Sequence, residues 1–111
     1  NNFNSLPEEC KKELLVVRES LISLLRKGSQ YSSSLKNGSG ESPVAIVKEI
    51  STFKASITER LEQNLIKFRG DSGNANISTY MLYQTVLQES QQIADSLKHL
   101  LRAYYKLYSI K

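Results

Sequence analysis

The sequence lacks tryptophan and contains one cysteine, one histidine and two prolines. Cys10 has no second cysteine with which to form an internal disulfide, which favours an intracellular protein, cytoplasmic or nuclear, over a disulfide-stabilised secreted one. Neither Cys10 nor His99 belongs to a motif with metal-ligand spacing, and no glycine-rich phosphate loop is present. We therefore expect no metal, no cofactor, no small-molecule substrate and no enzymatic activity.

Long hydrophobic runs are also missing. None approaches the roughly 18 residues that span a bilayer, and the first residues show no basic region followed by an apolar stretch, so we expect no signal peptide and no transmembrane segment. What is present is typical of one small folded domain: 111 residues, of which 40% are hydrophobic and 23% are charged. The net charge of +4 is too small to indicate a polyanion as the partner.

Hydrophobic periodicity predicts a first helix over residues 6–27. Ser5 and Glu8 form a capping box, and Gly28 follows the last turn as a helix stop. The predicted core stripe consists of Cys10, Leu14, Val17, Leu21 and Leu24. Residues 29–41 are rich in serine and glycine and are predicted to be a flexible connector, natural or engineered.

A second helix is predicted over residues 43–69, with Ser42 as its cap and Pro43 in its first turn. Its predicted stripe consists of Ile46, Ile50, Phe53, Ile57, Leu61, Leu65 and Phe68. A third helix is predicted over residues 77–110, with a kink or break near residues 89–92 as an open alternative. Its predicted buried stripe consists of Leu82, Val86, Ile93, Leu97, Leu100, Leu101, Tyr104 and Leu107.

Three long amphipathic helices predict an all-α, up-down-up bundle in a single domain, residues 1–111. In this arrangement we expect Leu97 and Leu101 to face the middle of the second helix. Leu15, Ile22 and Leu25 widen the first stripe beyond what two neighbouring helices would cover. We therefore expect these three residues to contact a partner helix or a second copy of the chain, which would complete a four-helix arrangement.

The end of the third helix is the second candidate surface. From Lys98 onward there are four cations, three tyrosines and no acidic residue. Lys98, Arg102, Tyr105, Lys106 and Tyr108 could form part of a protein interface, where tyrosine and arginine are enriched. The same residues could bind a nucleic acid by stacking bases and contacting phosphates. A third interpretation is structural, with the tyrosines covering the core and the cations favourable at a helix C-terminus.

The run from His99 to Ala103 resembles the His-x-Leu-Lys-Gly motif of histidine phosphotransfer domains, which are helical bundles of similar size. The resemblance implies a phosphoryl group carried on His99, with Arg102 as the cation one turn on. The chain departs from the motif at Ala103, where the family has glycine. Eight residues follow Ala103, whereas the family has a further helix there.

These observations lead to three hypotheses of function. The favoured one is a non-catalytic scaffold or adaptor module of a larger protein or assembly, which binds through an apolar inter-helix groove or through the tyrosine-rich end of the last helix. The alternative is a nucleic-acid-binding domain that uses Lys98, Arg102, Lys106 and Lys111. The third is phosphotransfer through His99.

Overall fold

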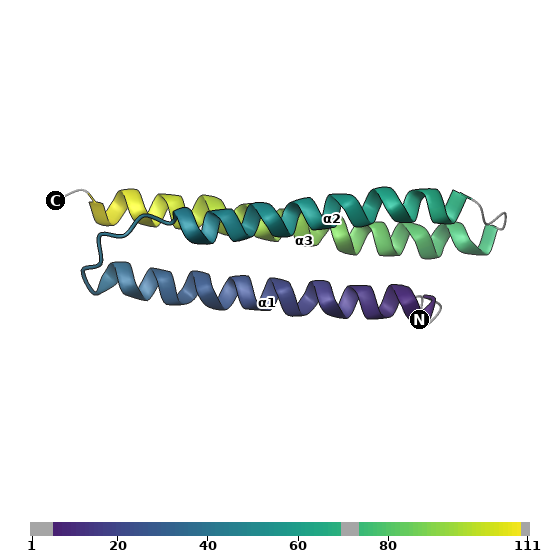
Figure 1. Ribbon diagram of the computed structural model, residues 1–111, viewed down its shortest axis with the longest axis horizontal. Coiled ribbons are helices and arrows are strands. Elements are labelled where there is room, and N and C mark those ends of the chain that lie inside the picture. The colour runs from purple at the N-terminus through teal and green to yellow at the C-terminus, as the bar shows by residue number, and fades with distance from the viewer. Residues whose placement is uncertain (1–5, 70–73, 110–111) are drawn as a thin grey trace.

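The chain forms a rod of three helices packed side by side (Figure 1). The structure, a computed structural model, describes residues 6–69 and 74–109, and side chains in residues 6–64 and 77–109. The helices are α1 (Glu8–Lys36), α2 (Val44–Arg69) and α3 (Asn74–Ser109), and the described residues contain no strand. The rod measures 60 × 23 × 16 Å. The predicted all-α, up-down-up bundle is confirmed, with α1 parallel to α3 and α2 antiparallel to both (Figure 1).

The core consists of positions that recur at alternating steps of four and three residues. This average spacing of 3.5 keeps one seam of a helix against its neighbour over many turns, which explains the long, nearly parallel packing. In α1 these positions are Cys10, Leu14, Val17, Leu21, Leu24, Gly28, Tyr31 and Leu35. In α2 they include Ile50, Phe53, Ile57 and Asn64, and in α3 they include Tyr83, Leu87, Ser90, Ala94, Leu97 and Leu101.

Three positions predicted for the first two helices cannot be compared with the structure. Ser5, the predicted cap of the first helix, and the side chains of Leu65 and Phe68, predicted for the stripe of the second, lie outside the described residues.

The predicted connector over residues 29–41 is wrong for its first eight residues, because α1 continues to Lys36. Tyr31 and Leu35 are buried, at steps of three and four beyond Gly28, and so extend the core stripe of α1. The Tyr31 hydroxyl also donates a hydrogen bond to the carbonyl oxygen of Glu41 at 2.6 Å. Packing of these two side chains therefore outweighs the low helix propensity of the surrounding serines.

Gly28 does not end a helix, contrary to the prediction. It is buried within α1, where a Cβ atom added to its backbone would lie 2.8 Å from Cδ1 of Leu97 in α3. The missing side chain therefore lets α1 and α3 approach closely at this level.

Gly28→Leu should destabilise the protein by about 1–3 kcal/mol, because the new side chain would compete with Leu97 for the same space. Urea denaturation followed by circular dichroism measures the effect. Gly40→Leu is the matched control, since Gly40 is exposed and a Cβ atom added there would meet no other atom within 4 Å. The control should change the stability little. Equal losses of stability in the two variants would show that the close approach of α1 and α3 does not limit the size of the side chain at position 28.

The register of α2 against α3 corrects another prediction. Asn64 reaches Tyr83, and Lys54 reaches Asp95 across the interface. By this register Leu97 lies level with Ile50, so the expectation that Leu97 and Leu101 face the middle of α2 is wrong by about two turns. The physical reason is the short connection between α2 and α3, which places residues equally distant from it opposite one another. α3 continues through residues 89–92 as one helix without a break.

Candidate protein interaction surfaces

The first surface is an apolar groove between α1 and α3 with a volume of about 390 Å³. It is lined by Leu14, Leu15, Val17, Arg18, Leu21, Ile22, Leu25, Val86 and Ser90. The three residues predicted to bind a partner, Leu15, Ile22 and Leu25, therefore lie together in one groove. Leu15 and Leu25 are 53% and 43% exposed, which shows that the bundle itself does not cover them.

The apolar stripe continues along α3 at steps of seven residues from Val86, through Ile93 and Leu100 to Leu107. Each of these residues directly precedes a core position of α3 or a partly buried one. A seven-residue repeat stays on one side of a helix packed with this period, so the series follows the side of α3 that lines the groove. Ile93, Leu100 and Leu107 are 45%, 48% and 62% exposed, and their predicted burial is therefore wrong. Tyr83, Leu87 and Ala94 occupy the core instead.

Among the described residues that line this groove, Arg18 is the only charged one. Within the part of the chain that the structure describes, its guanidinium makes no ion pair, whereas several other cations of the bundle do. Arg18 is exposed in the free bundle, so water solvates its charge, but a partner that covered the groove would have to supply an anion, because the described lining has none.

The second surface is a pocket of about 550 Å³ between the start of α2 and the end of α3. Its lining consists of Pro43, Val44, Val47, Lys48, Ser51, Arg102, Tyr105 and Lys106. The structure thus brings together three of the five residues predicted at the end of the third helix. The contribution of α2 was missed, because residues so far apart in the sequence give no common pattern.

The other two predicted residues lie elsewhere. Tyr108 is partly buried against the hydrophobic core, as is Tyr104, so both act at least in part as packing residues. Lys98 is engaged by Asp95, whose Oδ1 atom lies 3.0 Å from the Lys98 ammonium nitrogen. Lys111, which the nucleic-acid hypothesis also needs, lies outside the described residues.

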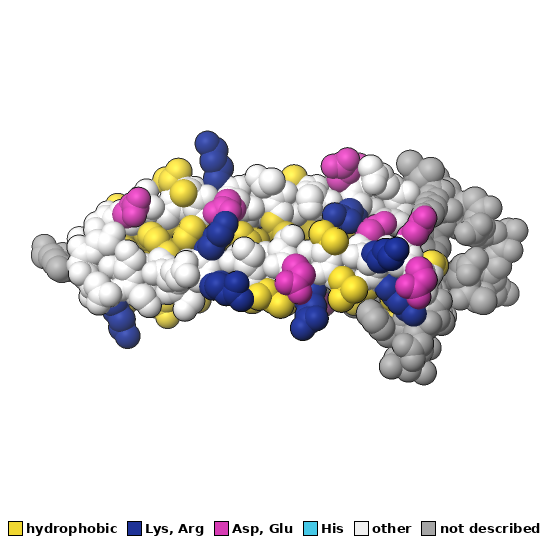
Figure 2. All heavy atoms as spheres, turned by 60° about the horizontal axis from the view of Figure 1, so that its bottom comes forward, with side chains coloured by type: hydrophobic (Ala, Val, Ile, Leu, Met, Phe, Trp, Pro, Cys, Tyr) yellow, Lys and Arg dark blue, Asp and Glu magenta, His cyan; other side chains and the backbone are white. Residues whose placement is uncertain are grey.

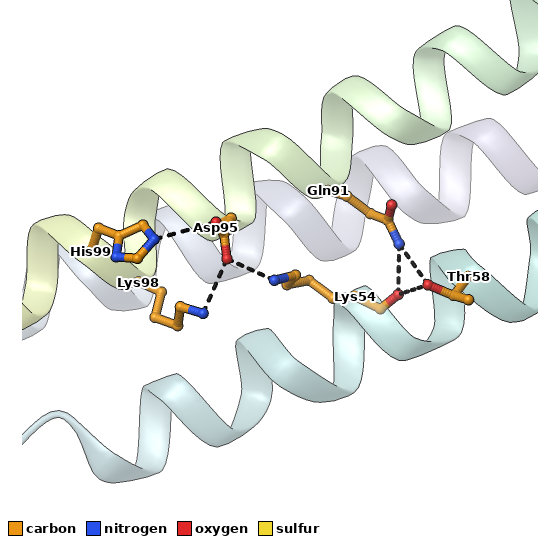
Figure 3. Close-up of polar contacts among 6 residues, drawn as sticks. All are labelled: Lys54, Thr58, Gln91, Asp95, Lys98 and His99. Carbon is orange, nitrogen blue, oxygen red and sulfur yellow. Dashed lines mark hydrogen bonds and ion pairs between the residues drawn. The ribbon is translucent and has the colours of Figure 1, made fainter.

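Asp95 is the centre of a polar cluster on the α2–α3 surface (Figure 3). Its carboxylate lies 2.6 Å from Nζ of Lys54 and 3.3 Å from Nε2 of His99. Hydrogen bonds from Lys54 and Lys98 hold the pKa of Asp95 well below its usual range. Nearby, the Gln91 amide donates to the carbonyl oxygen of Lys54 at 2.9 Å, which ties α3 to α2 (Figure 3).

This cluster bears on the phosphotransfer hypothesis. The exposed imidazole of His99 has a carboxylate at 3.3 Å from its Nε2 atom, and a negative charge there would repel a phosphoryl group on that nitrogen. Lys98 already neutralises Asp95 rather than standing free beside His99. The geometry therefore does not favour the role that the resemblance implies.

A third groove, of about 830 Å³, separates α1 from α2. Figure 2 looks onto this face, where hydrophobic side chains follow the hollow and charged side chains of both signs stand along it. The Lys27 ammonium and the Glu49 carboxylate bridge the two helices at 2.5 Å. Leu24, Phe53 and Ala45 form the apolar part of its lining, and the two large side chains, Leu24 and Phe53, are buried, so this groove offers fewer exposed large apolar side chains than the α1–α3 groove.

A polar cluster inside the bundle was missed by sequence reasoning. The fully buried Tyr83 donates its hydroxyl hydrogen bond to the Glu13 carboxylate, and the Asn64 amide donates to the Tyr83 oxygen at 3.1 Å. Arg60 lies 3.6 Å from the same carboxylate. Burial and the contact with Glu13 raise the pKa of Tyr83 above its ordinary value. These groups satisfy one another, which indicates a structural cluster.

Within residues 6–69 and 74–109, no three histidine, cysteine, aspartate or glutamate side chains are placed to hold a metal ion. None of the helices in these ranges combines the length and the apolar character needed to cross a membrane. No protein-family model, curated protein or solved structure matches the chain.

Proposed function

We propose that this chain is a non-catalytic protein-interaction module, a scaffold or adaptor, that binds an amphipathic helix of another protein along its α1–α3 groove. The observation that carries the proposal is the exposed series Ile93, Leu100 and Leu107, which continues along α3 at steps of seven residues from Val86 in the groove that also holds the exposed Leu15 and Leu25 of α1. Large apolar side chains gathered along one groove are characteristic of interaction sites on soluble proteins.

The geometry of the groove favours a helix over other occupants. Two parallel helices with outward apolar positions at heptad spacing present the same type of surface that each helix of a bundle offers its neighbours. An added helix would place its own apolar stripe on Leu15, Ile22 and Leu25 and continue along α3 toward Leu107. This is the helix-in-groove mode of recognition, which uses apolar anchors three and four residues apart.

Arg18 adds a chemical requirement to the partner. Because its guanidinium has no anion among the described residues, a helix with one acidic side chain near the middle of its apolar stripe fits the groove better than a purely apolar one. The same requirement lowers affinity for basic amphipathic helices. We place this interaction inside the cell.

A titration with a designed peptide tests the proposal. The probe is a 28-residue amphipathic helix with leucine at the heptad core positions and one central glutamate, and binding is followed by methyl-group NMR of the protein. We expect shifts in Leu15, Ile22, Leu25 and Ile93, and at least a tenfold weaker affinity for the Leu15→Glu/Leu25→Glu variant. Both side chains are more than two-fifths exposed in the free bundle, so the variant should fold.

Val44→Glu is the matched control, since Val44 is 65% exposed and lies at the start of α2, away from the groove. It should bind the peptide as the unmodified chain does. Methyl shifts confined to other faces, or equal losses in both variants, would contradict the proposal. Analytical ultracentrifugation tests whether the chain forms a homodimer. If it does, and Leu15→Glu/Leu25→Glu disrupts the dimer, the helix that occupies the groove belongs to a second copy of the chain.

A further inference from the structure

We propose that the pocket between the start of α2 and the end of α3 binds an acidic peptide segment through an apolar anchor side chain. This basic pocket is the one lined by Pro43, Val44, Val47, Lys48, Ser51, Arg102, Tyr105 and Lys106. It lies between α2 and α3, whereas the proposed helix-binding groove lies between α1 and α3, so the two sites are independent.

The charge of the pocket is entirely of one sign. Lys48, Arg102 and Lys106 line it, and none of the described residues that line it is an aspartate or a glutamate. Among the described residues none of these three cations takes part in an ion pair, whereas Lys27, Lys54, Lys98 and Arg60 all do. The pocket therefore holds a positive charge that the described part of the chain does not neutralise itself.

The start of α2 adds to this positive potential. Its first turn contains no acidic residue, so the positive end of the helix dipole is not offset by a side chain within that turn. Two carboxylates lie near this region. Glu49 pairs with Lys27 of α1. Glu41 is exposed to water, and its backbone carbonyl oxygen accepts a hydrogen bond from the Tyr31 hydroxyl at 2.6 Å.

The same pocket has an apolar surface. Val44 is 65% exposed, and it lies with Val47, Pro43 and the ring of Tyr105 around a volume of about 550 Å³. Sites that bury ligand groups have volumes of roughly 300–1,000 Å³ and combine apolar walls with a few charged groups. One phenylalanine or leucine side chain fits such a space and would cover surface that the bundle leaves in water.

The distribution of the cations indicates a chain-like ligand. Lys48 comes from α2, while Arg102 and Lys106 come from α3, one turn apart. A compact anion would be held by cations that converge on one point. Cations on both walls of an apolar pocket instead fit carboxylates placed on either side of an anchor residue. An acidic segment with a central aromatic or leucine residue meets both requirements.

Fluorescence anisotropy with a labelled peptide tests this proposal. The probe is an eight-residue peptide with a central Phe-Leu pair flanked by aspartate and glutamate, and two matched probes carry asparagine and glutamine for the acids, or serine for Phe-Leu. We expect both matched probes to bind at least tenfold more weakly. Affinity for the acidic probe should also fall as salt rises from 50 to 300 mM, because exposed charge pairs are screened.

Protein variants identify the site. Arg102→Gln/Lys106→Gln should weaken binding of the acidic probe at least tenfold. Lys12→Gln/Arg26→Gln, which removes the same charge from exposed positions of α1, should weaken it less than twofold. Circular dichroism shows that both variants fold. Because the Leu15→Glu/Leu25→Glu variant leaves this pocket intact, it should bind the acidic probe normally, which separates this proposal from the proposed function.

Three results would overturn the inference. Equal losses in the two charge variants would mean that net charge alone attracts the peptide. Equal affinity for the neutral probe would mean that the cations have no role. Vesicles containing 30% phosphatidylserine that bind in an Arg102- and Lys106-dependent way, with no binding of the acidic peptide, would assign the pocket to a lipid surface instead.

Discussion

Ile57→Ala should lower the free energy of unfolding by about 2–5 kcal/mol, a large share of the total stability of a small domain. Ile57 is fully buried near the middle of α2, where it belongs to the core shared by all three helices. Truncation removes three methyl or methylene groups from a position that neighbouring helices cannot easily collapse onto, since each is a long rod held along its whole length.

Urea denaturation measures this loss, with Ser56→Ala as the matched control on the same helix. Ser56 is exposed and directly precedes Ile57, and alanine favours a helix at least as well as serine, so the control should shift the stability by less than about 0.5 kcal/mol. Lys54 is a poorer control than its sequence position indicates, because its ammonium bonds Asp95 of α3. Similar losses for Ile57→Ala and Ser56→Ala would contradict the orientation of α2.

Tyr83→Phe should cost about 1–3 kcal/mol, although it removes a single oxygen atom. The hydroxyl is the buried donor to the Glu13 carboxylate, and the Asn64 amide in turn donates to that hydroxyl. Without the hydroxyl, the Glu13 carboxylate keeps two partners: the Arg60 guanidinium at 3.6 Å and the Asn64 amide nitrogen at 3.4 Å, a long hydrogen bond. Tyr104→Phe is the control, because Tyr104 is partly buried without a hydrogen bond from its hydroxyl among the described residues, and it should be nearly neutral. Chemical denaturation of both variants measures the difference.

The pH dependence of stability provides an independent measurement of the same cluster. Burial, together with Glu13, raises the pKa of Tyr83 above its ordinary value of 10.0. A group whose pKa is higher in the folded state stabilises the fold fully below its unfolded pKa, and this contribution is lost as pH rises beyond it. Stability should therefore decline above about pH 10 more steeply in the unmodified chain than in Tyr83→Phe. Parallel alkaline profiles would show that Tyr83 is not protected by the cluster.

The fold could be predicted because the heptad spacing of the core is strong in all three helices. Ile50, Phe53 and Ile57 were correctly placed in the core on spacing alone. The end of α1 could not be predicted from local propensity, since Tyr31 and Leu35 become helical through contacts that only the assembled bundle supplies.

The burial pattern of α3 was harder to predict for a related reason. Two apolar series with the same period run along α3, one residue apart, and only one can face the centre of the bundle. Tyr83, Leu87 and Ala94 do so, whereas Ile93 and Leu100 remain exposed. In α2, Leu61 packs partly buried against the core as predicted, whereas Asn64, three residues on, is buried because Tyr83 and Glu13 supply hydrogen-bond partners for its amide.

Each candidate surface is formed by two helices, and the sequence predicted the residues of only one of them. Leu15, Ile22 and Leu25 stood out because a single helix carried more apolar residues than it could bury. The matching stripe of α3 and the valines of the basic pocket belong to other helices, and their place depends on the parallel packing of α1 on α3 and on the register of α2 against α3. Such juxtapositions have no signal within any one segment.

The parallel arrangement of α1 and α3 has a mechanical consequence. The first turn of α1 and the last turn of α3 lie at opposite ends of the rod (Figure 1). A pulling force applied between Glu8 and Ser109 would therefore act along the helix axes and shear whole interfaces at once, so that many side-chain contacts resist it together. The same force applied at one end, between Lys36 and Val44, would separate α1 from α2 one turn at a time, so that few contacts resist it at any moment. We therefore expect the rod to resist a lengthwise pull better than peeling from one end.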